Sequence, residues 1–66
     1  MTFELNGRPQ ETPDDITVRV LLESFDLHRR RVAVAINASV IPKSHFDEVR
    51  IHEGDSVEVI QAVGGG

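Results

Sequence analysis

The segment Ser56-Val57-Glu58-Val59-Ile60-Gln61-Ala62 decides the fold, because its valines recur with the period-two spacing of a half-buried strand. We expect Val57 and Val59 to face the core. The outward positions are Glu58, Ile60 and Ala62. Gly54-Asp55, just before this segment, signals a turn. The other elements are assigned by how they could pair with or cover this last strand.

The N-terminal residues predict a β-hairpin. Apolar and polar residues alternate over residues 1–6, and Asn6-Gly7 supplies the two positive φ angles that a type I′ turn needs. The chain should therefore return as a second strand over residues 8–12. Pro9 marks that strand as an edge, because proline has no N–H to donate to a further neighbour.

A helix is predicted after this hairpin, over about residues 18–26. Its core-facing side has apolar residues at i, i+3, i+4 and i+7, which are Val18, Leu21, Leu22 and Phe25. Thr17 is the expected N-cap, and Ile16 stands at the hydrophobic-staple position before it. We therefore expect one helix with one buried face.

The middle of the chain predicts further strands. Residues 32–37 alternate again, with Val32, Val34 and Ile36 assigned to the core. Residues 39–42 end in proline and should form a brief edge strand. We expect the connector over residues 27–31 to be polar. Residues 43–51 should be irregular, with at most one helical turn around a core-filling Phe46.

This order of elements, ββαββ, predicts a domain of the α+β class. A single helix covers only one face of the sheet, and a last strand beside the first is reached by a crossover and runs parallel to it. That is the β-grasp arrangement of ubiquitin-like domains. We therefore expect a mixed sheet of four to five strands with one main helix packed on one face, over residues 1–62.

Length and charge exclude several classes of function. A chain of 66 residues supports one modest core, with no room for a walled active site. The net charge of −4 and the pI near 5.1 argue against nucleic acid and anionic membranes as partners. With no cysteine, the chain has no disulfide, thiolate nucleophile or Cys-ligated zinc. Neither a signal sequence nor a membrane-spanning apolar run is present. We expect a cytoplasmic protein that is monomeric when free.

Residues 63–66, Val63-Gly64-Gly65-Gly66, predict a flexible tail. Three consecutive residues without Cβ can pass through a gap too narrow for a side chain. The α-carboxylate of Gly66 is ionised at neutral pH and needs no base to act as a nucleophile. Fully extended, residues 62–66 would carry it roughly 17 Å beyond the strand. The glycines alone would more often indicate a frayed terminus.

Several segments together resemble a known family. They are Val32-Ala33-Val34-Ala35-Ile36-Asn37, Ile41-Pro42, Gly54-Asp55-Ser56-Val57-Glu58-Val59-Ile60 and Ala62-Val63-Gly64-Gly65-Gly66. The chain resembles the ThiS family of thiamine-biosynthesis sulfur carriers over essentially its whole length. A Gly-Asp turn and a terminal Gly-Gly occur in many ubiquitin-like carriers. The "VAVAIN" strand followed by "IP", and the "AVGGG" ending, are the more specific pieces.

The resemblance implies a protein substrate that is not itself an enzyme. In the family, a ThiF-type enzyme uses ATP to convert the terminal carboxylate to an acyl adenylate. Sulfur from a cysteine persulfide, supplied indirectly by a cysteine-desulfurase-type donor, then displaces the adenylate. Gly66 would carry the glycyl adenylate and then a thiocarboxylate (1-thioglycine), with no bound cofactor. Val63, Gly64 and Gly65 would thread into partner active sites, and thiazole synthase, ThiG, would accept the sulfur.

Three alternatives stay open at this point. The small subunit of molybdopterin synthase shares the fold and the activated tail but has a different acceptor. A protein modifier would be joined to lysines, and Lys43 is the single internal lysine on which self-chains could form. A plain interaction domain with an accidental tail is the third.

The outward face of the last strand is the predicted docking site for both enzymes. It is centred on Ile60, with Glu58, Ala62 and Ala35. An apolar residue at an outward position is common on protein surfaces, but it can equally anchor a partner. The three histidines lack metal-site spacing, so we predict no metal. The Arg29-Arg30-Arg31 run would more often be a solvated turn, with a role in docking as the alternative.

Overall fold

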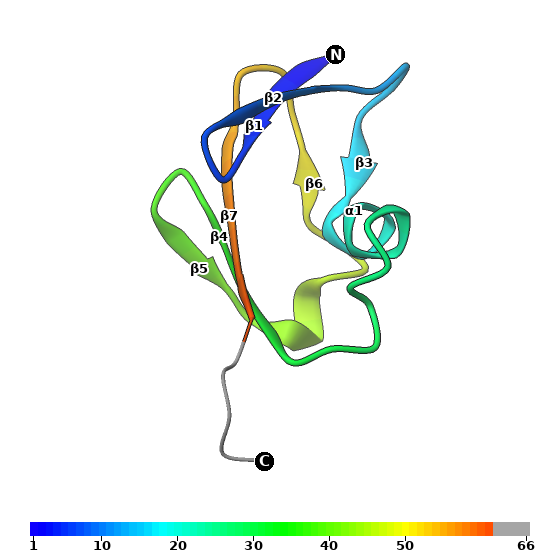
Figure 1. The fold of residues 1–66 in the computed structure, drawn as a ribbon, viewed down its shortest axis with the longest axis vertical. Helices are drawn as coiled ribbons and strands as arrows, with labels where there is room; N and C mark the ends of the chain where they lie inside the picture. The colour runs from blue at the N-terminus through cyan, green and yellow to red at the C-terminus, as the bar shows by residue number, and fades with distance from the viewer. Residues whose placement is uncertain (62–66) are drawn as a thin grey trace.

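A mixed sheet of five strands is the framework of the protein in the computed structural model, which describes residues 1–61 (Figure 1). Its strands are β1 (Thr2–Leu5), β2 (Arg8–Glu11), β4 (Val32–Ile36), β5 (Ser39–Ile41) and β7 (Ser56–Gln61), in the order β2-β1-β7-β4-β5. β7 is parallel to β1 and antiparallel to β4. The predicted ββαββ β-grasp sheet, with its last strand beside the first, is confirmed.

The N-terminal hairpin forms as predicted. Asn6 and Gly7 have φ angles of 51° and 82°, and β2 is an edge strand that pairs with β1 alone. The Asn6 side chain also completes the short parallel pairing of β1 with β7. Its Oδ1 accepts from the Val59 N–H at 2.9 Å, and its Nδ2 donates to the Val59 carbonyl at 3.2 Å. The amide thus continues the β1 hydrogen-bond ladder past the last residue of the strand.

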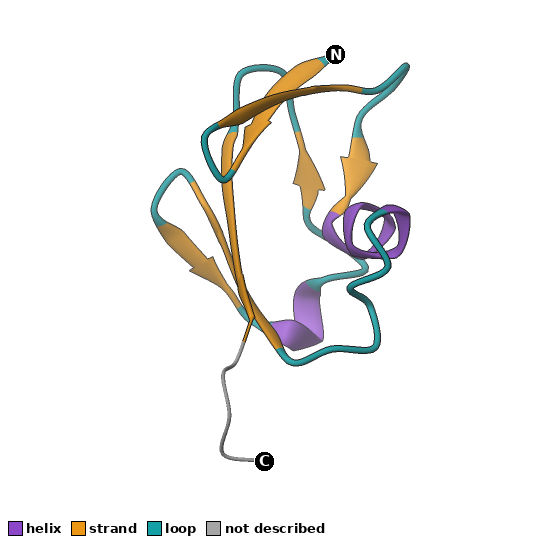
Figure 2. Ribbon diagram, viewed as in Figure 1, coloured by secondary structure: helices purple, strands orange, loops and turns teal. Residues whose placement is uncertain are grey.

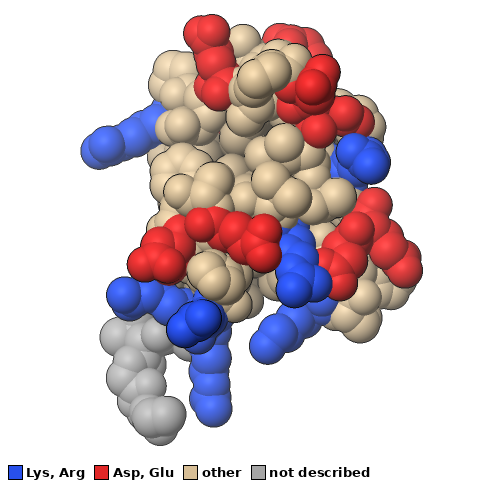
Figure 3. Space-filling model, turned by 90° about the vertical axis from the view of Figure 1, so that its right-hand side faces the viewer, with Lys and Arg blue, Asp and Glu red and all other residues tan. Residues whose placement is uncertain are grey.

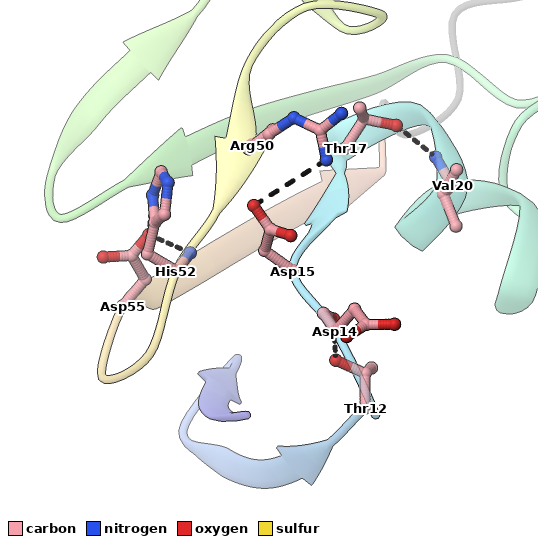
Figure 4. Close-up of polar contacts among 8 residues, drawn as sticks. All are labelled: Thr12, Asp14, Asp15, Thr17, Val20, Arg50, His52 and Asp55. Atoms are coloured by element: carbon pink, nitrogen blue, oxygen red, sulfur yellow. Dashed lines mark hydrogen bonds and ion pairs between the residues drawn. The ribbon is translucent and has the colours of Figure 1, made fainter.

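Helix α1 (Val18–Ser24) begins where the sequence predicts and ends earlier. The Thr17 hydroxyl caps it by accepting from the Val20 N–H at 3.2 Å (Figure 4). Its end is a Schellman motif, in which Asp26 takes a left-handed φ of 59° and the Leu27 N–H donates to the Leu22 carbonyl.

This early end corrects two predictions. Phe25 was expected on the buried helix face, but the chain leaves the helical path there and its side chain is 44% exposed. Leu27 was expected in a polar connector, but it packs half-buried against the core. A Schellman motif favours an apolar contact at the second residue beyond the C-cap, which is the place of Leu27.

A second, two-stranded sheet was not predicted. β3 (Ile16–Thr17) pairs antiparallel with β6 (Arg50–Ile51), and Asp15 lies 3.7 Å from Arg50 (Figure 4). The prediction that residues 43–51 are irregular was therefore wrong at their end. The expected helical turn is the 3₁₀ helix η1 (Lys43–His45), which ends at Phe46. Phe46 only borders the core, whereas Ile51 is fully buried within it.

The core lies between the sheet and the helical layer. Figure 2 shows α1 and η1 on one side of β4 and β7, with the other side of these strands uncovered. The buried residues are Phe3, Leu5, Val18, Leu21, Leu22, Val34, Ile36, Ile51, Val57 and Val59. The predicted inward positions of β7 and β4 are thus confirmed. No helix within residues 1–61 is long and apolar enough to cross a membrane.

Candidate functional site

The predicted carrier residue, Gly66, lies outside the described residues, as do Ala62, Val63, Gly64 and Gly65. The structure does define where the chain leaves the sheet. β7 ends at Gln61, which pairs with Val32, the first residue of β4. The five residues that follow can reach at most roughly 17 Å from that point. The position of β7 therefore limits where the Gly66 carboxylate can act.

The strand that leads to this point is fixed at its start by polar contacts. The Asn37 Oδ1 accepts from the Ser56 N–H at 3.0 Å, and the Asn37 Nδ2 donates to Asp55 Oδ1 at 3.1 Å. The Asp55 Oδ2 accepts from the His52 N–H at 2.8 Å, which closes the predicted Gly54-Asp55 turn (Figure 4). The asparagine of the "VAVAIN" segment is thus a registration contact for β7, a role the sequence did not indicate.

The uncovered side of β4, β5 and β7, here called the open face, carries the predicted docking residues. Ile60 is 63% exposed, and Ala33 lies opposite it on β4. In the next row Ala35 of β4 lies between Glu58 and Val40. Of the predicted docking residues that the structure describes, all three lie together on this face: Ile60, Glu58 and Ala35.

Val40 belongs to this face and was not predicted. It is 75% exposed, more than any other large apolar residue recorded as exposed within residues 1–61. Its exposure follows from strand geometry. Ile41 packs against the core, and successive side chains of a strand point to opposite faces, so Val40 points outward. A shallow hollow of about 270 Å³ is lined by Ala33, Val34, Ala35, Ala38, Val40, Glu58 and Ile60. The small alanine side chains leave room there for an inserted apolar group.

A second concavity, here called the basic groove, opens on the helical side of the sheet and holds about 470 Å³. It is lined by Arg19, Leu22, His28, Arg30, Arg31, Val32, Lys43, Phe46 and Asp47. The Arg19 guanidinium donates to the Asp47 carboxylate at 2.9 Å and lies 3.5 Å from Glu23. The hydrogen bond with Asp47 raises the pKa of Arg19.

The histidines lie in three separate places. His28 follows α1, His45 ends η1, and His52 is in the turn before β7. Within residues 1–61, no group of three or more histidine or acidic side chains is placed to hold a metal ion.

Comparison with known proteins gives consistent matches. The family model described as the ThiS family matches residues 3–66. The sulfur carrier protein ThiS of Bacillus subtilis is 34% identical over 65 residues, with 97% of this chain and 98% of that protein covered. A crystal structure of the thiamine biosynthesis protein ThiS from Geobacter metallireducens superposes with a TM-score of 0.86, at 29% identity and full coverage of both chains.

A larger protein also contains a similar stretch. The thiazole synthase of Paramagnetospirillum magneticum is 33% identical over all 66 residues of this chain. The chain spans only 20% of that protein's length.

Proposed function

The chain belongs to the ThiS family, and on that premise we propose that it carries sulfur for thiamine biosynthesis as a thiocarboxylate on Gly66. The observation that supports this most is the extent of the family match, which runs to Gly66 itself. The matched region therefore includes the glycines that would present the carboxylate. Because the chain has no cysteine, it has no thiol on which to hold sulfur, and the terminal carboxylate is the group left for that purpose.

The proposed chemistry takes place in partner enzymes. In a ThiF-type adenylating enzyme, the Gly66 carboxylate attacks the α-phosphate of ATP, and pyrophosphate leaves. The outer sulfur of a cysteine persulfide, formed with sulfur from a cysteine-desulfurase-type enzyme, then attacks the acyl carbon, and AMP leaves. A thiol reduces the resulting acyl disulfide, which releases the thiocarboxylate and leaves the two thiols joined as a disulfide. One carboxylate oxygen has been replaced by sulfur. The chain is a substrate throughout, and Val63, Gly64 and Gly65 are the thread that enters the active sites.

Thiazole synthase, ThiG, is the proposed sulfur acceptor. Support comes from the thiazole synthase of P. magneticum, which contains a stretch similar to the whole chain. Two binding modules in one polypeptide meet at a high effective concentration.

The open face is the proposed docking surface for both enzymes, through Ile60 and Glu58 together with Val40, Ala35 and Ala62. α1 and η1 cover the opposite side of the sheet, so these strands offer one face to a partner. The same strand, β7, carries Ile60 and determines where the tail begins. A partner that binds this face therefore also sets the position of the tail relative to its own active site.

The test uses the tail itself. Removal of Gly66, or Gly65→Ala, is expected to abolish or strongly reduce ATP–pyrophosphate exchange by the adenylating enzyme. Removal of Gly66 leaves the terminal carboxylate one residue short of its normal position. Gly65→Ala adds a Cβ to the segment that must enter the active site. Thermal melting should be unchanged, because the buried core residues of the described chain lie between Phe3 and Val59. Normal exchange by the protein without Gly66 would rule out this residue as the carrier.

A further inference from the structure

Positive charge gathers at one end of this acidic protein. The chain has net charge −4 and seven Lys and Arg residues. Figure 3 shows basic side chains together at the lower end, which is the end where β7 terminates in Figure 1. Arg29, Arg30 and Arg31 directly precede Val32, the residue that pairs with Gln61. The basic end and the departure point of the tail therefore coincide.

The cations at this end have no acidic partner within residues 1–61. The ion pairs in that part of the chain involve Arg19, Arg50 and His52, and none involves Arg29, Arg30, Arg31 or Lys43. Asp47 is the acidic residue of the basic groove, and it pairs with Arg19 at 2.9 Å. Among residues 1–61, no carboxylate therefore forms an ion pair with Arg30, Arg31 or Lys43.

The basic groove also has an apolar component. Val32 and Phe46 are only partly buried against the core and keep apolar surface on the groove, whereas Leu22 is buried beneath it. A concavity of about 470 Å³ lies in the size range of sites that enclose a small ligand or several side chains. Apolar residues ringed by these cations complement a segment that carries both carboxylates and an apolar side chain.

We propose that the basic groove seats an acidic segment of the adenylating enzyme. Carboxylates of that segment pair with Arg30, Arg31 and Lys43, and an apolar side chain of the segment rests on Phe46. The inference rests on the proposed function and extends it, since it gives this enzyme a contact on the helical side of the sheet as well as on the open face.

Electrostatics favours the adenylating enzyme over the sulfur acceptor for this contact. Adenylation brings an anionic carboxylate, on a chain of net charge −4, to ATP, which is also anionic. Like charges oppose that approach. A basic end beside Gln61, the last described residue, orients the chain so that this end approaches first, and it gives the enzyme's acidic segment a group to attract. Charge steering of this kind weakens with salt.

The experiment is titration calorimetry of the full chain against the adenylating enzyme, with three charge-matched variants. Arg31→Glu reverses a groove cation, and Arg8→Glu reverses an exposed cation on β2, outside the groove lining. Each variant changes the net charge by the same amount. We expect Arg31→Glu to weaken binding about tenfold or more at low salt, with the loss shrinking as salt is raised. Arg8→Glu should stay within about twofold of wild type, and Lys43→Glu should repeat the groove effect.

The outcomes separate this inference from the function it rests on. Wild-type binding with equal affinities for Arg31→Glu and Arg8→Glu would overturn the groove assignment alone, because net charge would then explain any loss. Absence of wild-type binding would overturn the proposed function, and the groove assignment with it. The substituted positions are exposed, so the variants should unfold at the same temperature as the wild type. A selective loss of affinity can then be attributed to docking.

Discussion

The two faces of β7 differ sharply although their residues alternate along one strand. Val57 and Val59 are buried under the helical layer, whereas Ile60 is 63% exposed on the open face. The pleat of a strand sends successive side chains to opposite sides, so adjacent positions can have unrelated roles. We therefore expect substitutions on the covered face to change stability and those on the open face to change docking.

The largest expected effect is on the covered face. Leu21→Ala should lower the free energy of unfolding by about 2–5 kcal/mol, the usual range for a truncated buried leucine. Leu21 is 2% exposed in a small core, so a substantial fraction of the protein should unfold. Denaturant or thermal unfolding measures the change. Val20→Ala is the matched control on the same helix, because Val20 is exposed and should cost little. Equal losses for the two variants would show that the buried helix face is wrongly assigned.

The next effect tests the join between β1 and β7. Asn6→Ala should destabilise the protein by about 1–3 kcal/mol, because it removes two hydrogen bonds to Val59 and puts alanine at a positive φ that asparagine adopts more readily. Asn6→Gly tolerates the φ angle but still lacks the amide, so it should recover only the conformational part. If Asn6→Gly unfolded at the same temperature as the wild type, the Asn6 amide would contribute nothing measurable to stability.

The smallest effect on stability, with a selective effect on docking, is expected on the open face. Burial of an isoleucine side chain contributes about 1.5–3 kcal/mol by area. Ile60→Asp should therefore weaken binding to both enzymes at least about tenfold, while the melting temperature barely changes. Calorimetric titrations test this, with Val20→Asp as the control that adds the same charge on the helix. Unchanged affinity of Ile60→Asp for both enzymes would mean that the partners bind another surface.

The long, periodic elements were predictable because their patterns extend over several residues. The hairpin turn at Asn6-Gly7, the N-cap Thr17 and the inward valines of β7 all stand where the sequence places them. The pairing of β3 with β6 was not, because two residues are too few to show a period. The end of α1 was also missed. Asp26 takes the left-handed conformation that glycine usually marks at a helix end, so no glycine signalled the stop.

The candidate site likewise has one part that the sequence predicts and one part that it does not. Ile60 and Glu58 could be assigned to one face from alternation within a single strand. The basic groove could not, because its lining comes from four parts of the chain: α1, the connector after it, the start of β4, and the residues around η1. An arginine run predicts a solvated turn unless the residues brought beside it are known.

The intact mass of the protein, after incubation with the adenylating enzyme, ATP and a sulfur donor, tests the central claim most directly. We predict a mass gain equal to one oxygen replaced by one sulfur, absent without ATP and absent in the protein that lacks Gly66. A large adduct on a lysine of another protein would instead identify a modifier. An unchanged mass, under conditions in which the enzyme binds the chain, would contradict the assignment of Gly66 as a sulfur carrier.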